Sequence, residues 1–208
     1  MSEGTKPDAA EDRRLVRAAQ TGDEQAFRQL VVRYQRRVYQ LALGMTKDPD
    51  DAMDIAQETF VRVHRYLPTF KGDSSFFTWT YRIAMNLSLD FQRRKGRAER
   101  VDQLEGDEAE IEAAMDPPSA ALAGPQRAAL NSELKEKIEE ALAGLSENHR
   151  AILLLREVEG LSYAELAKVL GIRKGTVMSR LFHARLKMQK KLREYLGEDA
   201  PEPGEGEE

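Results

Sequence analysis

The chain has 208 residues, 33% of them charged and 41% hydrophobic, which is enough for one mid-sized domain or two small ones. It contains no cysteine, which excludes disulfides, thiol nucleophiles and thiolate metal sites, and its three histidines form no pair with metal-ligand spacing. No apolar run approaches the ~20 residues of a membrane-spanning helix, and the first residues are polar, so we expect a cytoplasmic protein without membrane insertion.

The net charge of −4 conceals two acidic stretches. Val101–Gln126 carries seven acidic and no basic residues, and Gly197–Glu208 carries six acidic and no basic ones. Without these 13 acids the chain has 32 basic against 23 acidic residues, which favours a polyanionic partner such as nucleic acid. Proline and glycine in both stretches indicate linkers or tails rather than parts of a core.

The segment Glu11–Arg100 is predicted to be all-helical, because its apolar residues recur at helical spacing and no alternating strand pattern is present. Three helix starts carry capping residues. The expected starts are Thr21 or Asp23, then Asp48-Pro49, then Ser75 before a helix from Phe76 to about Arg94.

An acidic row marks the second of these helices. Asp51, Asp54 and Glu58 are spaced i, i+3 and i+7 and share one helix face with Gln57 beside them. The row could dock on a basic partner surface or bind a metal ion, and the DDxxD pattern that begins at Asp50 matches the magnesium motif of terpenoid synthases. Acids at a helix N-terminus also favour the macrodipole, which explains the first two acids well but Glu58 poorly.

Aromatic residues are concentrated in Phe70–Phe91, and basic residues follow in Arg93–Arg100. Phe76 and Trp79, three apart, are expected to pack inward, whereas aromatic residues near Lys71 could stack on unpaired bases. The basic residues could hold phosphates, although a solvated helix end that complements the dipole is the plain alternative.

The segment Leu161–Val177 has the pattern of a helix-turn-helix. Ser162 and Glu165 form a capping box at the start of a short helix, and Gly171 permits the tight turn that ends it. A longer helix is expected from about Lys174 to Leu196.

The helix-turn-helix and the helix that follows are strongly basic, since Leu166–Arg193 contains nine bases and no acid. A helical hairpin with a solvated basic face would show the same charge. The turn, the capping box and the charge together favour DNA binding in the major groove, with Arg180 as the best candidate for bidentate recognition of guanine.

In this order, the motifs resemble the extracytoplasmic-function (ECF, group 4) sigma factors of bacterial RNA polymerase, which belong to the sigma-70 family. Asp51–Phe60 is similar to the family's core-binding segment, Phe70–Asn86 to its promoter-melting segment, and Gly175–Arg185 to its region 4 recognition helix. The resemblance covers nearly the whole chain except the acidic stretches and the extreme N-terminus. It implies an all-α fold of two small helical domains, a region 2 helical bundle and a region 4 helix-turn-helix, joined by a flexible acidic linker.

The resemblance also implies the division of the chain and its partners. The expected segments are a disordered N-terminus (1–12), region 2 (13–100), an acidic linker (101–129), region 4 (130–196) and an acidic disordered tail (197–208). The partners are core RNA polymerase through its β and β′ subunits, promoter DNA and an anti-sigma factor. The chain is expected to need no cofactor or metal and to have no catalytic activity of its own.

Three sets of binding residues follow from the resemblance. The residues expected to bind core polymerase are Asp51, Asp54, Ile55, Gln57, Glu58 and Phe60. Those expected at the −10 element are Phe70, Lys71, Gly72, Asp73, Ser74, Ser75, Phe76, Asn86, Arg93, Arg94 and Arg97. Those expected at the −35 element are Arg173, Lys174, Thr176, Met178, Ser179, Arg180, Phe182, His183 and Arg185.

Two positions depart from the family pattern, because Met178 and His183 stand where relatives often have Lys or Arg. A methionine donates no hydrogen bond, so the −35 preference is expected to differ or to rest more on Arg180. Two other classes of protein remain as alternatives. An ordinary helix-turn-helix regulator would explain only the C-terminal motif, and a magnesium-dependent all-α enzyme would need a second acidic motif that the sequence lacks.

Overall fold

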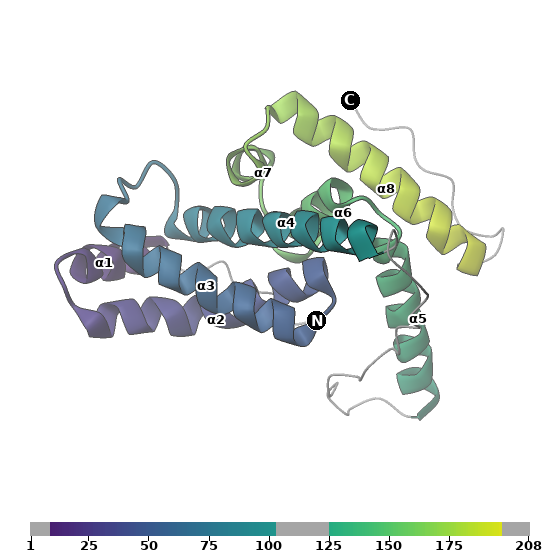
Figure 1. Cartoon of the computed structure of the whole chain (residues 1–208), viewed down its shortest axis with the longest axis horizontal. Coiled ribbons are helices and arrows are strands. Elements are labelled where there is room, and N and C mark those ends of the chain that lie inside the picture. Colours follow the sequence, from purple (N-terminus) through teal and green to yellow (C-terminus); the bar gives the residue numbers. More distant parts are fainter. Residues whose placement is uncertain (1–8, 103–124, 197–208) are drawn as a thin grey trace.

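The computed structural model describes residues 9–102 and 125–196, and the side chains of 9–96 and 133–193. The described residues form helices and no strand, which confirms the predicted all-α class (Figure 1). We call the helices before residue 103 the N-terminal unit and those after residue 124 the C-terminal unit. The N-terminal unit consists of α1 (Ala9–Gln20), α2 (Glu24–Thr46), α3 (Pro49–Tyr66), a short 3₁₀ turn (Leu67–Thr69) and α4 (Phe76–Asp102). The C-terminal unit consists of α5 (Pro125–Ala143), α6 (Glu147–Leu153), a π-helical turn (Leu154–Val158), α7 (Tyr163–Leu170) and α8 (Lys174–Leu196).

The predicted capping residues start the helices of the N-terminal unit. The Asp23 side chain accepts hydrogen bonds from two backbone N–H groups of the first turn of α2, at 2.9 and 3.0 Å. Asp48 caps α3 in the same way, with Pro49 at the first helical position. Ser75 Oγ accepts a bond from Thr78 N at 3.1 Å at the start of α4.

Three element boundaries differ from the prediction. Helix α1 begins at Ala9, inside the segment expected to be disordered, and Asp12 on it is buried. Helix α4 continues past Gly96 to Asp102 instead of ending near Arg94, and α5 begins at Pro125, inside the expected linker. Residues 103–124 and the expected tail lie outside the described residues.

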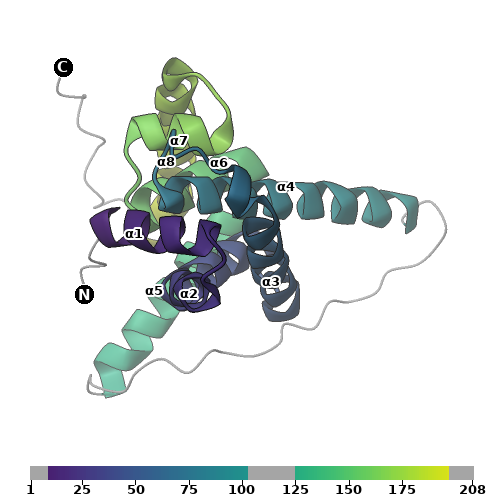
Figure 2. The ribbon, with the colours of Figure 1, turned by 90° about the vertical axis from the view of Figure 1, so that its left-hand side faces the viewer.

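The two units pack against each other through α4. Helices α6 and α7 both contact α4, and α6 also contacts α2 (Figures 1 and 2). One continuous cluster of buried apolar side chains runs from Leu15 and Tyr34 in the N-terminal unit to Leu155, Leu166 and Leu181 in the C-terminal unit. The two units therefore share one main core.

Candidate nucleic-acid and protein interfaces

The helix-turn-helix is built as the sequence predicts. Ser162 Oγ accepts a hydrogen bond from Glu165 N at 3.3 Å, and Ser162 N donates to Glu165 Oε2 at 2.8 Å, which completes the capping box. Helix α7 ends at Gly171, whose φ of +64° lies in the left-handed region that glycine adopts readily. Val177 is fully buried beneath the turn and fixes the start of α8.

Helix α8 presents a mixed basic and apolar face to solvent. Met178, Phe182 and Leu186 follow one another every four residues and are 55%, 64% and 47% exposed. Thr176 and Arg180 are half-buried, and the other residues predicted to contact the −35 element are exposed. The exposed ones are Arg173, Lys174, Met178, Ser179, Phe182, His183 and Arg185.

Two basic side chains of α8 are already engaged within the C-terminal unit. Arg180 Nη1 lies 3.4 Å from Asn148 Oδ1, and Arg185 Nη2 lies 2.7 Å from Glu157 Oε1. The surrounding positive charge also acts on His149. Partial burial lowers the pKa of this imidazole, and the charge of Lys187 lowers it further.

The acidic row lies on the solvent side of α3. Asp54 and Gln57 are exposed, and Asp51 and Glu58 are half-buried. Lys95 Nζ lies 3.4 Å from Asp51 Oδ2, and Arg62 Nε lies 2.7 Å from Glu58 Oε1. Exposed pairs of this kind exchange readily for a partner's charges, because water screens them.

Ile55, which is predicted to contact core polymerase, exposes little surface to a partner in this structure. It is only 5% exposed and packs on the inner face of α3, in a small apolar cluster with Ala42, Ala52 and Leu87. The sequence pattern placed it beside the acidic row, but one residue along a helix turns the side chain by about 100°. Phe60, in contrast, is half-buried and reaches the edge of the surface.

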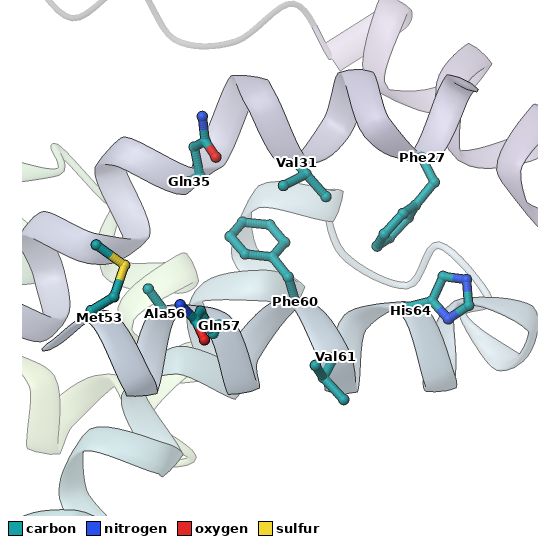
Figure 3. Close-up of a pocket in the computed structure, with 9 residues that line it drawn as sticks. All are labelled: Phe27, Val31, Gln35, Met53, Ala56, Gln57, Phe60, Val61 and His64. Carbon is teal, nitrogen blue, oxygen red and sulfur yellow. The ribbon is translucent and has the colours of Figure 1, made fainter. Parts of the chain in front are cut away.

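An apolar groove of about 580 Å³ runs between α2 and α3, beside the acidic row (Figure 3). Met53 and Val61 on its rim are 49% and 60% exposed, and the Phe27 ring packs edge-on against His64 at 4.8 Å between ring centroids. Sequence analysis missed this groove, because Phe27 fits the inner face of α2 and the exposed apolar residues of α3 fall outside its inner-face pattern. The lining residues are Phe27, Val31, Gln35, Met53, Ala56, Gln57, Phe60, Val61 and His64.

The loop before α4 combines an aromatic wall with exposed polar groups. The Phe70 ring is half-buried and lies 4.7 Å from the Trp79 ring, centroid to centroid. Phe76 is 4% exposed, which agrees with its predicted inward packing and leaves little of its ring available to DNA in this structure. Lys71, Gly72, Asp73 and Ser75 of the loop are exposed, and Ser74 is half-buried.

The remaining residues predicted at the −10 element lie further along α4. Asn86 is exposed and ten residues beyond Phe76, which places it about 15 Å along the axis at the ordinary helical rise. The structure thus does not bring Asn86 into the Phe70–Ser75 loop. Arg93 and Arg94 are exposed, and the side chain of Arg97 lies outside the described ones.

Comparison with known proteins decides between the three classes of protein. Residues 30–98 match the family model Sigma-70 region 2, and residues 135–188 match Sigma-70, region 4. The chain belongs to the sigma-70 family. It is 38% identical over 198 residues to the RNA polymerase sigma-H factor of Pseudomonas aeruginosa, covering 90% of this chain and 97% of that one. It is 37% identical over 177 residues to the ECF RNA polymerase sigma-E factor of Escherichia coli K12, covering 84% and 90%.

A solved structure of a relative shares the fold. CnrH, in complex with the cytosolic domain of CnrY, matches with a TM-score of 0.65 and 27% identity, covering 88% of this chain and 98% of CnrH. The ECF resemblance and the two-domain helical fold inferred from the sequence are thereby confirmed. Sigma factors are transcription regulators rather than enzymes, so the magnesium-dependent enzyme is set aside. The match of residues 30–98 to Sigma-70 region 2 sets the ordinary regulator aside, because that class explains only the C-terminal motif. In the described part of the chain, no helix is long and apolar enough to cross a bilayer.

Proposed function

We propose that this ECF sigma factor binds core RNA polymerase, recognises the −35 and −10 promoter elements, melts the promoter and directs transcription initiation. The observation that carries the proposal is the pairing of two surfaces in one chain. The N-terminal unit exposes Asp54 and Gln57 beside an apolar groove, and the C-terminal unit exposes the basic helix α8. Within this division, region 2 function belongs to 13–100, region 4 function to 130–196, and the acidic linker to 101–129.

The surface of α3 suits the polymerase. The acidic row complements the basic coiled-coil clamp helices that the family resemblance assigns to the β′ subunit, and charge complementarity speeds and orients docking. The groove beside it supplies apolar contact area, which charged side chains alone do not. The docking residues are Asp51, Asp54, Gln57, Glu58 and Phe60, joined by Met53 and Val61 on the groove rim.

The loop before α4 suits a base flipped out of the duplex. Phe70, supported by Trp79, offers a stacking surface, and the exposed polar groups of the loop can bond to the edge of the base. Asn86, Arg93, Arg94 and Arg97 follow along α4 and would hold the neighbouring strand. The loop residues are Phe70, Lys71, Gly72, Asp73, Ser74 and Ser75.

Helix α8 suits the major groove of the −35 element. Its basic residues hold phosphates, which positions the helix, and the side chains near its start reach base edges. Arg180 must leave Asn148 to reach guanine, at the cost of one long exposed hydrogen bond. Met178 and Phe182 add apolar surface that suits thymine methyl groups.

Control by an anti-sigma factor is part of the proposal. The CnrH structure was solved with the cytosolic domain of a second protein, CnrY. By likeness to it, we expect this chain to be held inactive by a partner protein in the cytoplasm until a signal releases it. The chain acts through binding alone and has no catalytic activity of its own.

The decisive experiment is in vitro transcription with bacterial core polymerase on a pool of promoter fragments. The chain should produce specific transcripts, and Asp54→Arg should reduce them at least tenfold by placing a positive charge against the basic clamp. The matched control is Glu136→Arg, an exposed acid on α5 far in sequence from the row. Equal loss in both variants, or specific transcripts from core polymerase alone, would contradict the proposal.

A further inference from the structure

Glu159 belongs to the C-terminal unit but forms its bonds with the N-terminal unit. Its residue exposure is only 7%. Glu159 Oε2 accepts hydrogen bonds from Arg37 Nε at 3.0 Å and from the Tyr81 hydroxyl at 2.7 Å, and it lies 2.8 Å from Arg37 Nη2. We call these three residues the Glu159 triad. These side-chain contacts join α2 and α4 to the C-terminal unit.

The surroundings of the Glu159 triad are apolar and tightly packed. The Arg37 guanidinium lies 4.9 Å from the centre of the Phe77 ring, which in turn lies 4.3 Å from the Tyr81 ring. Tyr81 is fully buried. Nearby, Gly44 of α2 faces Leu154, and a Cβ added at Gly44 would lie 2.9 Å from Leu154 Cδ1. The two units are thus in close contact at the Glu159 triad and again at Gly44, seven residues beyond Arg37 on α2.

A second buried polar link supports the same contact. Arg150 of α6 is 8% exposed, and its Nη1 donates to the Met45 carbonyl of α2 at 3.0 Å. Its other nitrogens bond to carbonyls at the end of α5. The side chain therefore joins the end of α2 to the C-terminal unit.

This packing brings the helix-turn-helix against the loop before α4. Lys168 Nζ, on the first helix of the helix-turn-helix, donates to the Asp73 carbonyl at 3.0 Å, in the loop proposed to bind the −10 element. The two promoter elements are named for positions about 25 base pairs apart, which is about 85 Å of duplex at ~3.4 Å per pair. A molecule whose helix-turn-helix touches this loop cannot place the loop and helix α8 on both elements at once.

We propose that the Glu159 triad is a latch that holds this sigma factor in a closed, promoter-incompetent conformation, and that the latch must open before the −35 and −10 elements are bound together. The inference rests on the proposed function for its biological meaning, but the closed packing itself does not. The latch is autoinhibitory, because the population of closed molecules reduces the fraction able to engage a promoter.

A buried ion pair suits a latch that must open. Such a pair adds little net stability compared with apolar packing, because its desolvation offsets its attraction, yet it penalises any arrangement that leaves one charge buried alone. The buried pair therefore selects one closed geometry without adding much to its stability. Glu159 also follows directly on the π-helical turn Leu154–Val158, a local distortion of the kind found at functional sites.

The test uses the full-length chain with two labels. The native chain has no cysteine, so Arg17→Cys on α1 and Lys190→Cys on α8, both exposed, can carry a fluorophore pair without other changes. Energy transfer in the free protein should report one predominantly closed population. Glu159→Arg, which puts two cations together in the triad, should raise the open population at least tenfold.

Two further variants separate a broken latch from a misfolded protein. Arg37→Glu combined with Glu159→Arg restores an opposite pair and should return most of the closed population. Gly44→Leu leaves the triad intact and should open the molecule by steric contact with Leu154. Arg33→Gln, which breaks an ion pair inside the N-terminal unit, is the matched control and should not change the transfer.

The functional readout is transcript yield per holoenzyme at limiting promoter. Both Glu159→Arg and Gly44→Leu should raise it several-fold over the wild type. Unchanged energy transfer in Glu159→Arg, or a double variant as open as the single one, would overturn the latch. A wild-type chain that yields no polymerase-dependent transcript would instead contradict the proposed function, while the transfer measurements would still decide the latch.

Discussion

Two buried carboxylates in this protein, Asp12 and Glu159, have the same kinds of partner but join different parts of the molecule. Asp12 of α1 is held by Arg33 at 2.6 Å and by the Tyr34 hydroxyl, both on α2, and we call these residues the Asp12 triad. The Glu159 triad repeats the set of acid, arginine and tyrosine with partners 122 and 78 residues away. The first joins neighbouring helices of one unit, and the second joins two units. The same chemistry therefore stabilises a fold in one place and a conformation in the other.

The largest expected difference between the two triads is in the free energy of unfolding. Asp12→Ala should lower the free energy of unfolding of the N-terminal unit by about 3 kcal/mol, the low end for a broken buried pair, because Arg33 can still reach water. Glu159→Ala should lower it by less than ~1 kcal/mol, because its cost falls on the contact between units. Trp79, the single tryptophan, reports the N-terminal unit by fluorescence during urea denaturation.

A control for this comparison is the exposed pair of Asp90 and Arg93, at 3.3 Å. Asp90→Ala should change the free energy of unfolding by less than ~0.5 kcal/mol, because exposed pairs contribute little. Equal destabilisation by Asp12→Ala and Glu159→Ala would show that the Glu159 triad is part of the fold of the N-terminal unit, and the contrast between the triads would be lost.

Gly44→Ala should separate helix stability from closure. Alanine in place of glycine inside α2 favours the helix by up to ~1 kcal/mol. The same methyl group would lie 2.9 Å from Leu154 Cδ1, so either the Leu154 side chain or the C-terminal unit must move. We expect the urea midpoint of the N-terminal unit to rise while the closed population falls about threefold. If the urea midpoint and the closed population both rise, the Leu154 side chain moves aside without disturbing the contact between the units.

The alkaline response should differ between opening and unfolding. Burial raises the pKa of the Tyr81 hydroxyl, and the negative charge of Glu159 raises it further. Burial also raises the pKa of the Tyr34 hydroxyl, and its hydrogen bond to Asp12 adds to this increase. Both tyrosines are thus protonated donors in the closed fold. A raised pKa gives stability that is complete below the ordinary tyrosine value of about 10 and is lost as pH rises above it.

Opening exposes only Tyr81, whereas unfolding exposes both tyrosines. The energy-transfer signal should therefore begin to fall above pH 10, before Trp79 fluorescence reports unfolding, and Tyr81→Phe should remove this early fall. An early fall that persists in Tyr81→Phe would assign the alkaline opening to other groups, such as the lysines at the interface.

The sequence predicted those features that neighbouring residues determine. Ser162, Glu165 and Gly171 define the helix-turn-helix because capping and turn geometry depend on residues a few positions apart. Proline within Val101–Gln126 indicates a linker, whereas Pro125 in fact starts α5, because proline is favoured at the first helical position. Helix α4 continues through Gly96 instead of ending near Arg94, because one glycine inside a helix costs only ~1 kcal/mol.

The contacts between distant segments could not be predicted in this way. Ile55 and Phe76 lie within motifs of the family, but burial depends on which helix faces which, and both proved to be core residues. The burial of Glu159 could not be predicted from the sequence, because an acid after a helix is normally solvated and its partners are far away in sequence. The α2–α3 groove likewise exists only once Phe27 and Val61 are brought together by packing.

The smallest expected effect concerns the third cross-unit contact. Lys168 Nζ bonds to the Asp73 carbonyl at 3.0 Å on the exposed rim, so water can replace it on either side. Lys168→Met, which keeps much of the side-chain volume, should change the open population by less than twofold, against at least tenfold for Glu159→Arg. The same label pair measures both. A large opening in Lys168→Met would move the latch from the buried triad to the rim. Because exposed bonds are satisfied equally well in the open molecule, we expect the buried carboxylate, whose partners lose their fixed geometry on opening, to control the equilibrium.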